Sequence, residues 1–302
     1  MTMEIYYDIV KTKKKFIWAI NRYGFSPEHN YYNYLYTQNP LKKGVFFDFG
    51  KRKGIIAFYN KSNNTWRVIN GVFAPKAERL SVLLDFIGWA FAEKKSKKIF
   101  VEASEDFKSQ IFKKLKNLYR LNVNYILHWP VYDLHSLDEK LSGKKWKKLR
   151  NINNRFRKFF VVKIKNPRRV NNRVLKNILF RWTRKRYPRD RANYDYYVNL
   201  IENNFKGFGI IRAVSLNGEV CSFSGGWIVP NSKIFYCGVG IFNYNHKDLG
   251  DFVSLDDLLH LKKLGYRYVD FGGSEMSLLH FKKKFYPAKI YKTYVFSISR
   301  KK

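Results

Sequence analysis

A double glycine behind a short apolar stretch is the first place in this sequence where chemistry can be expected. Tyr268–Phe271 has the pattern of a strand, and Gly272, Gly273 and Ser274 follow it directly. Glycines leave backbone accessible where a strand of an α/β sheet ends, which is the usual place for a ligand. The N–H groups of a helix beginning at Ser274 and Glu275 could bind an anion or a developing oxyanion. A tight turn without any ligand would use the same residues.

Carboxylates near this turn are candidates for a general base. Asp270 lies in the strand, Glu275 lies in the first turn of the helix that follows, and Asp251 lies at the start of the helix that precedes. A base that deprotonates an amine or hydroxyl needs a pKa raised towards neutrality by partial burial. Asp251 is the first choice, because we expect it to face the crevice of the sheet. Helix capping alone would also explain Asp251 and Glu275.

Tyrosines and lysines follow the same segment. Tyr286 or Tyr291 could return a proton to the leaving group of an acyl transfer. Backbone N–H groups near Val239 and Gly240, or at the double glycine, could stabilise the oxyanion. The run Lys282–Lys284 would by itself indicate a solvated face.

The basic side chains are distributed unevenly. The formal net charge is +36, and residues 141–191 contain 20 basic residues and a single acid. Such a block attracts polyanions, for example nucleic acid or an anionic membrane. Within it, Lys147 and Arg150 share one face of a predicted helix and could clamp a phosphate. The alternative is a lysine-rich composition that merely decorates solvated faces.

Several functional classes find no support. Two cysteines and six scattered histidines argue against a metal site. The sequence lacks a Walker-type phosphate loop, a dinucleotide-binding fingerprint and a nucleophile elbow. No apolar run approaches the roughly 18 residues of a transmembrane helix, and the N-terminus does not resemble a signal peptide. We therefore expect a cytoplasmic protein without a bound metal or cofactor.

The elements that position these residues form two series. In the first half, strands are predicted at residues 44–49, 54–59, 66–73, 98–102 and 122–132, with helices at 78–93 and 104–116. The first forty residues are aromatic and show no clear period. In the second half, helices are predicted at 137–160, 171–187, 194–205, 250–264 and 276–284, with strands at 161–165, 209–215, 219–228, 234–241, 268–271 and 290–297.

Both halves contain the order β-β-β-α-β-α-β. This repetition predicts an α/β (α+β) fold of two tandem modules, residues 1–136 and 137–302, each a mixed, mostly antiparallel sheet flanked by helices. The oligomeric state is not indicated.

Three segments together resemble a known family. They are Leu249–Phe252, Leu264–Glu275, and Phe281–Pro287 followed by Tyr291. Their order and spacing resemble the C-terminal catalytic region of the phosphatidylglycerol lysyltransferase-type proteins and, more loosely, the Fem-type peptidoglycan aminoacyltransferases. The resemblance covers residues 137–300 and is strongest at 249–291. It implies two GNAT-like folds side by side, with an acyltransferase site in the second.

The resemblance also implies a donor that carries phosphate. It places Lys282 near the donor's phosphates and the basic helix with Lys147 and Arg150 at the rim of the site. The remaining residues of the predicted donor site are Gly250, Gly272, Gly273, Ser274 and Tyr291.

One departure bears on the choice of donor. GNAT enzymes that use coenzyme A usually carry a Gln/Arg-x-x-Gly-x-Gly/Ala loop, whereas this chain keeps only Gly250 and has Asp248 and Asp251 beside it. Acids at this point, together with the basic block, favour aminoacyl-tRNA. We therefore predict transfer of an aminoacyl group to an amine or hydroxyl of a lipid, peptide or small molecule. An acyl-CoA-dependent N-acyltransferase is the alternative.

A non-catalytic nucleic-acid-binding protein is the alternative from another class. Trp182, Tyr187 and Tyr194 would then be stacking platforms for bases. This interpretation explains the charge but not the ordered pattern at 249–291. In either case tRNA or another polyanion is an expected partner, and the basic face could also rest peripherally on an anionic membrane.

Overall fold

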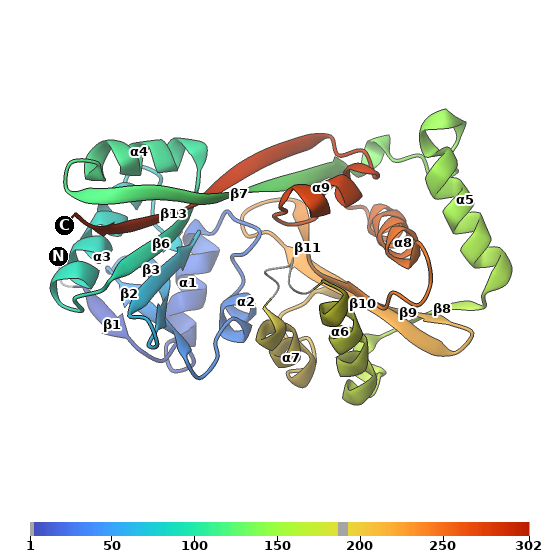
Figure 1. The fold of residues 1–302 in the computed structure, drawn as a ribbon, viewed down its shortest axis with the longest axis horizontal. Coiled ribbons are helices and arrows are strands. Elements are labelled where there is room, and N and C mark those ends of the chain that lie inside the picture. Colours follow the sequence, from blue (N-terminus) through green and yellow to red (C-terminus); the bar gives the residue numbers. More distant parts are fainter. Residues whose placement is uncertain (1–2, 187–192, 302) are drawn as a thin grey trace.

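The computed structural model describes residues 3–186 and 193–301. Within them, thirteen strands form one continuous sheet that runs the length of the molecule, and helices cover it (Figure 1). The first half contains β1 (Glu4–Tyr6), α1 (Lys13–Tyr23), α2 (Tyr31–Tyr36), β2 (Lys42–Asp48), β3 (Gly54–Asn60), β4 (Thr65–Ile69), β5 (Val72–Phe73), α3 (Arg79–Ala92), β6 (Lys98–Ser104), α4 (Glu105–Leu115) and β7 (Tyr119–Asp133).

The second half repeats this order after a helical beginning. It contains α5 (Gly143–Phe159), β8 (Val162–Lys165), α6 (Asn172–Arg186), α7 (Tyr194–Glu202), β9 (Ile210–Leu216), β10 (Glu219–Ile228), β11 (Ile234–Phe242), α8 (Leu249–Lys263), β12 (Tyr268–Asp270), α9 (Met276–Lys283) and β13 (Lys289–Arg300), with 3-10 turns at Leu134–Ser136 and Pro167–Arg169.

Three local differences from the predicted elements have physical causes. The aromatic opening segment forms α1 and α2, because Phe16, Tyr31 and Tyr34 pack into one core. The sequence of this segment shows no helical periodicity, so these helices were not predicted. The strand predicted at residues 66–73 is broken after β4, where Asn70 has φ 46° and a Cβ at Gly71 would lie 2.3 Å from the Ile56 carbonyl. The helix predicted from residue 137 begins only at Gly143.

Each half has the same internal pattern. In the first, β2, β3 and β4 are antiparallel, and β6 returns parallel to β4 after α3. In the second, β9, β10 and β11 are antiparallel, and β12 returns parallel to β11 after α8. The predicted duplication of a mixed, mostly antiparallel sheet is confirmed.

The last strand of each half pairs across to the other half. The sheet order is β1-β2-β3-β4-β6-β13-β7-β12-β11-β10-β9-β8, with β5 on β3. Strand β13 lies between β6 and β7, and β7 lies between β13 and β12. Figure 1 shows these two long strands crossing from one half to the other. A boundary at residue 136 therefore divides the chain but not the sheet.

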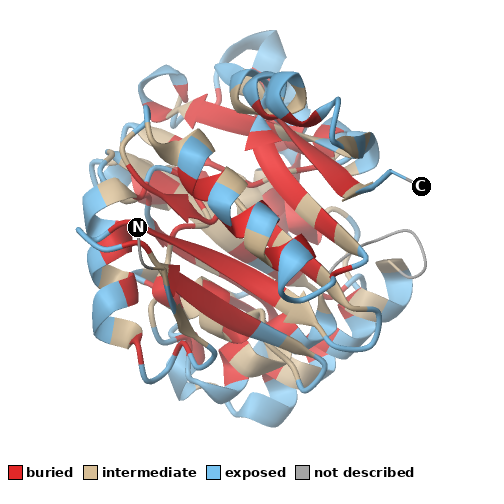
Figure 2. Ribbon diagram, turned by 90° about the vertical axis from the view of Figure 1, so that its left-hand side faces the viewer, coloured by how far each residue is buried: buried red, intermediate tan, exposed pale blue. Residues whose placement is uncertain are grey.

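The two faces of the sheet carry separate helical layers. Helices α3 and α4 cover one face of the first half, and α1 and α2 cover the other. In the second half α5 and α8 pack on one face, and α6 and α7 on the opposite one. The strands are mostly buried while the helices keep an exposed outer side (Figure 2). Tyr36 of α2 belongs to the core under α6 and α7, so the halves also share a core on that face.

Candidate active site

The parallel pair in the second half separates at its carboxyl end. Strands β11 and β12 pair only from Ile234↔Tyr268 to Tyr236↔Asp270. Beyond that point β11 continues alone on this side to Phe242, whereas β12 ends. The predicted oxyanion donors near Val239 and Gly240 lie on this continuation of β11. Divergence of two parallel strands is where an α/β sheet offers backbone groups to a ligand.

The end of β12 holds a buried carboxyl group. Asp270 is 1% exposed; its Oδ1 accepts a hydrogen bond from the Gly272 N–H at 2.7 Å, and its Oδ2 accepts one from the Tyr291 hydroxyl at 2.8 Å. Burial raises the pKa of Asp270 to about 6, although both hydrogen bonds and the charge of Lys282 oppose the shift. Burial and the charge of Asp270 also raise the pKa of Tyr291, so its hydroxyl stays protonated. This carboxylate is ionised at neutral pH and can still take up a proton.

Side chains pack closely against the turn that contains Gly272 and Gly273. A Cβ at Gly273 would lie 2.9 Å from the ring of Trp129, and one at Gly272 would lie 3.4 Å from Tyr236. Buried Lys282 reaches back from α9 and donates to the carbonyls of Phe271 and Gly272, the latter at 3.0 Å. Thus the turn predicted to be open is packed by aromatic rings, and the lysine predicted to meet phosphate holds the turn itself.

Ser274 anchors the other end of the turn. Its backbone exchanges two hydrogen bonds of 2.9 Å with His128 of β7, and its hydroxyl donates to the Gly272 carbonyl at 3.3 Å. Glu275 follows as the exposed N-cap residue of α9. The short helix α9 is therefore fixed to β7 at its beginning.

A chain of contacts links Asp270 to the first half. The Trp129 ring stacks on Tyr291 with centroids 5.7 Å apart and an interplanar angle of 10°. The Trp129 indole N–H donates to Thr293 at 2.8 Å, and the Thr293 hydroxyl donates to Glu102 at 2.7 Å. Trp129 lies on β7 and Tyr291 and Thr293 on β13, so the two crossing strands carry this connection.

Glu102 and Glu28 are acidic residues of this region that the sequence did not reveal. Burial raises the pKa of Glu102, against the hydrogen bond from Thr293. Burial and the charge of Glu102 raise the pKa of Glu28 to about 8. In the sequence Glu102 alternates with apolar residues of a strand, and Glu28 lies in a loop, so each has the appearance of a solvated residue. Their position at the junction of the two halves, which only the structure shows, distinguishes them from ordinary solvated acids.

The acids at the beginning of α8 are neutralised by basic side chains. Asp251 is buried and accepts from the Lys284 ammonium at 2.7 and 3.1 Å. Asp248 pairs with Arg155 of α5 at 2.8 Å. Gly250 packs against the Phe242 ring, where a Cβ would come within 2.5 Å. The predicted base Asp251 is therefore engaged in an ion pair that joins α8 to the end of α9.

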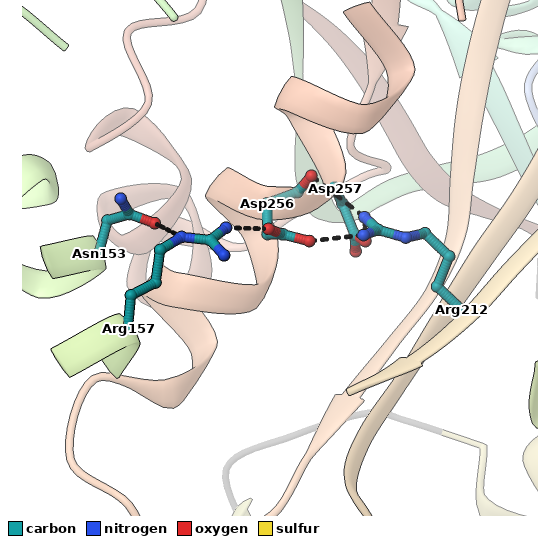
Figure 3. Close-up of polar contacts among 5 residues, drawn as sticks. All are labelled: Asn153, Arg157, Arg212, Asp256 and Asp257. Atoms are coloured by element: carbon teal, nitrogen blue, oxygen red, sulfur yellow. Dashed lines mark hydrogen bonds and ion pairs between the residues drawn. The ribbon is translucent and has the colours of Figure 1, made fainter. Parts of the chain in front are cut away.

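A charged network fixes α8 between α5 and the sheet. Arg212 of β9 binds Asp256 at 2.5 Å and Asp257 at 2.7 Å, and Asp256 also binds Arg157 of α5 at 2.7 Å (Figure 3). Burial raises the pKa of Asp257 to about 6 despite the charge of Arg212. This network orients α8, whose beginning follows the free part of β11.

Three predicted site residues lie on α5 or contact it, away from Asp270. Arg150 donates to the carbonyls of Leu141 and Gly143, the latter at 3.2 Å, and Tyr286 donates to the Lys145 carbonyl at 2.6 Å. Lys147 is exposed on α5. The structure thus brings together Asp270, Gly272, Gly273, Ser274, Lys282 and Tyr291, whereas Arg150, Tyr286 and Lys147 belong to the α5 side.

The proposed stacking residues have different positions. Trp182 is buried in the core beneath α6, and Tyr194 is exposed at the start of α7. Tyr187 lies outside the described residues. In residues 3–186 and 193–301 no group of three or more His, Cys, Asp or Glu side chains is arranged to hold a metal ion. Every helix of the described chain is too short or too polar to traverse a bilayer.

Solved structures share this fold. The L-PGS from Bacillus licheniformis has a TM-score of 0.66 and 16% identity, covering 95% of this chain and 91% of that one. FemX has a TM-score of 0.64 and 11% identity, covering 98% and 97%. A tandem GNAT protein from the clavulanic acid biosynthesis pathway has a TM-score of 0.55 and 10% identity, covering 99% and 98%. No family model and no curated protein matches the sequence. The tandem GNAT-like fold is confirmed, and so, at the level of the fold, is the resemblance on which it was predicted.

Proposed function

We propose that this protein is a GNAT-type acyltransferase that moves an aminoacyl group from aminoacyl-tRNA to an amine or hydroxyl. The observation that carries the proposal is the Asp270–Tyr291 pair at the point where β11 and β12 diverge. The fold shared with L-PGS and FemX supports the same reaction class. An ester of tRNA is already activated, so the protein needs mainly to position the reactants and polarise the carbonyl.

Asp270 and Tyr291 can move the proton that the reaction must remove. As the acceptor amine attacks the ester carbonyl, its proton passes to the Tyr291 oxygen while the Tyr291 proton passes to Asp270. The tetrahedral intermediate then expels the tRNA hydroxyl oxygen, and the same proton returns through Tyr291 to that oxygen. Asp270 is buried and Tyr291 is half-buried, so the tyrosine is the member of the pair that meets substrate. Asp270 is better suited to this role than Asp251, whose carboxylate is held by Lys284.

The surroundings of α8 support a tRNA donor. At the beginning of this helix Asp248 and Asp251 engage the basic side chains of Arg155 and Lys284, so these cations are not free for the pyrophosphate of coenzyme A. The exposed side of α5 carries lysines and arginines that suit an extended polyanion. The nucleic-acid-binding alternative loses one of its stacking platforms, because Trp182 is buried. An anionic membrane would contact the same basic face.

A transfer assay with a matched pair of variants tests the proposal. The protein is incubated with a pool of labelled aminoacyl-tRNA and a panel of amines and hydroxyl compounds. We expect product, and a loss of about 10²–10⁴-fold in rate for Asp270→Asn. Asp85→Asn, an exposed acid on α3, is the control and should retain activity. Product from acyl-coenzyme A alone would favour the alternative donor. Equal, strongly salt-dependent binding of tRNA and random RNA without product would contradict the enzyme.

A further inference from the structure

Three neighbouring strands place a row of side chains on one face of the sheet. Tyr291 of β13 lies directly opposite Trp129 of β7. Val295, further along β13, lies directly opposite Glu102 of β6. Because alternate residues of a strand share a face, Thr293 stands on this face too, between the two pairs. The row therefore runs from the candidate site to a strand of the first half.

The hydrogen bonds along this row can run in one direction only. An indole N–H donates and cannot accept, so the Thr293 oxygen must accept the bond of 2.8 Å from Trp129. The single hydroxyl proton of Thr293 is then donated to Glu102 at 2.7 Å. All three residues are at most 5% exposed, so bulk water does not compete for these groups. The carboxyl group of Glu102 thus orients the hydroxyl, and the hydroxyl fixes the edge of the indole ring.

The indole ring fixed in this way supports Tyr291. The two rings stack with their centroids 5.7 Å apart and their planes 10° apart. The indole also packs against the turn, where a Cβ at Gly273 would lie 2.9 Å from it. A phenol held against an immobile flat ring keeps its hydroxyl directed at one point, which here is the Asp270 carboxyl group at 2.8 Å.

We propose that Glu102 and Thr293 are positioning residues for the Tyr291 hydroxyl, and that they act through the indole ring of Trp129. Neither residue needs to meet substrate for this role, which suits their burial. Through Glu102 the first half of the chain takes part in the site of the second half. The importance of this row for acyl transfer rests on the proposed function, whereas its effect on the hydrogen bond between Tyr291 and Asp270 does not.

The titration of Asp270 measures the positioning without any substrate. It is followed by carbon-13 NMR of protein labelled at the aspartate carboxyl groups, and Asp270→Asn assigns the signal. Burial raises the pKa of Asp270 to about 6, and the hydrogen bond from Tyr291 opposes that rise. Tyr291→Phe removes the bond and should move the midpoint upward by about one pH unit. The Lys282 ammonium and the Gly272 N–H, which act on the same carboxyl group, are unchanged in every variant.

Substitutions along the row should move the same midpoint upward. Thr293→Val keeps the shape of the side chain but removes both hydrogen bonds, so we expect a rise of about half a pH unit or more. Thr293→Ser retains the hydroxyl and should titrate as the parent does. Glu102→Leu should give a higher midpoint than Glu102→Gln, which removes the same charge but keeps an acceptor oxygen. Ser297→Ala, another buried hydroxyl on β13, is the control and should leave the midpoint unchanged.

Two outcomes of the titration would overturn the proposal: an unmoved midpoint in Thr293→Val, or equal midpoints in Glu102→Leu and Glu102→Gln. The Glu102 pair decides the question if Thr293→Val does not fold.

Transfer assays then connect the positioning with the reaction. In Thr293→Val kcat should fall about tenfold to a hundredfold while KM stays within about twofold, and Thr293→Ser should restore kcat. A raised KM at unchanged kcat would mean that the row serves substrate binding, and would overturn the assignment. Midpoints that move as expected in a protein without transfer activity would reject the proposed reaction alone. Transfer activity with unmoved midpoints would reject the positioning alone.

Discussion

The proposed proton transfer depends on the hydrogen bond that the Tyr291 hydroxyl donates to Asp270. The hydrogen bond between them joins β12 to a strand 21 positions later, and no periodic pattern records such a contact. The ammonium of Lys282 was assigned to phosphate, whereas it binds carbonyl oxygens of the turn. Its place before Phe285 and Tyr286 could not show this, because the direction of a side chain at the end of a short helix depends on what that helix packs against.

The pH dependence of transfer should follow Asp270. Its pKa is raised to about 6, and only the ionised carboxylate can take up the proton that the attacking amine gives up through Tyr291. We expect the rate to rise between pH 5 and pH 7 with a midpoint near 6, measured as kcat/KM with saturating acceptor. Asp270→Asn should flatten this limb without unfolding the protein, because a carboxyl group with a raised pKa costs folding free energy when it ionises. An unshifted rising limb in Asp270→Asn would contradict this assignment.

His29 should make folding sensitive to acid. Its Nδ1 accepts from the Phe25 N–H at 2.9 Å and its Nε2 binds the Asn70 carbonyl at 2.7 Å, so the buried ring is neutral. Burial lowers the pKa of His29 to about 3. Below pH 6.5 the unfolded chain binds a proton that the folded one does not, and this residue's contribution to stability falls by about 1.4 kcal/mol per pH unit.

Urea unfolding at pH 7, 6 and 5 measures this contribution. His29→Gln should be less stable than the parent at pH 7 by about 1–3 kcal/mol, because it disturbs both hydrogen bonds. The difference should shrink at pH 5, where the parent has lost the histidine's contribution and the variant has nothing to lose. A difference that stays constant over this range would show that His29 does not titrate with unfolding.

At the scale of elements, helices and strands with a clear period were predicted well. The helix predicted at residues 78–93 is α3, and the strands predicted at 219–228 and 234–241 are β10 and β11. The helices α1 and α2 were not predicted, since α2 has only six residues and its tyrosines face two different cores. A helix of that length exists because of tertiary packing, which a local pattern does not contain.

Arg212 should matter more for the position of α8 than the exposed partner in the same network. Arg212 and the side chains of Asp256 and Asp257 are largely shielded from water. Arg212→Leu removes the cation of Asp257 and leaves Asp256 with the exposed Arg157 alone, so we expect a loss of about 3–5 kcal/mol in the free energy of unfolding. Arg157→Leu is the matched control; half of its side chain is exposed, and its loss should be below about 1 kcal/mol.

The stability lost in Arg212→Leu should be smaller at acidic pH. The Asp257 pKa is already raised to about 6, and removal of Arg212 takes away a charge that lowers it. Protonation below this pKa neutralises the unpaired carboxyl group, so the loss measured by urea unfolding should be smaller at pH 5 than at pH 8. Equal losses for the two arginine variants would contradict the picture of a buried network.

For the molecule as a whole, the exchange of last strands should make the two halves one cooperative unit. Strand β13 brings Tyr294, Phe296 and Ile298 into the core of the first half, and each buried apolar side chain contributes about 1.5–3 kcal/mol. The duplicated order of elements was predictable, but the partners of β7 and β13 were not, because both strands have the same alternating pattern whichever neighbour they join.

Two truncations test this cooperativity. Removal of residues 288–302 should abolish the folded state of both halves, seen as loss of near-ultraviolet circular dichroism and of a thermal transition. Removal of residues 1–6, which takes away only the edge strand β1, should leave a single transition at a lower temperature. Survival of a folded first half after loss of β13 would show that the halves are independent.

The place of β13 also bears on how the chain is made. A ribosome releases β6 and β7 more than 150 residues before the strand that lies between them, so both remain unpaired on facing sides during most of synthesis. Contacts this distant form slowly, and open strand edges invite aggregation in the meantime. The sheet of the first half is therefore incomplete until translation reaches β13, and until then its open strand edges need protection, for example by a chaperone.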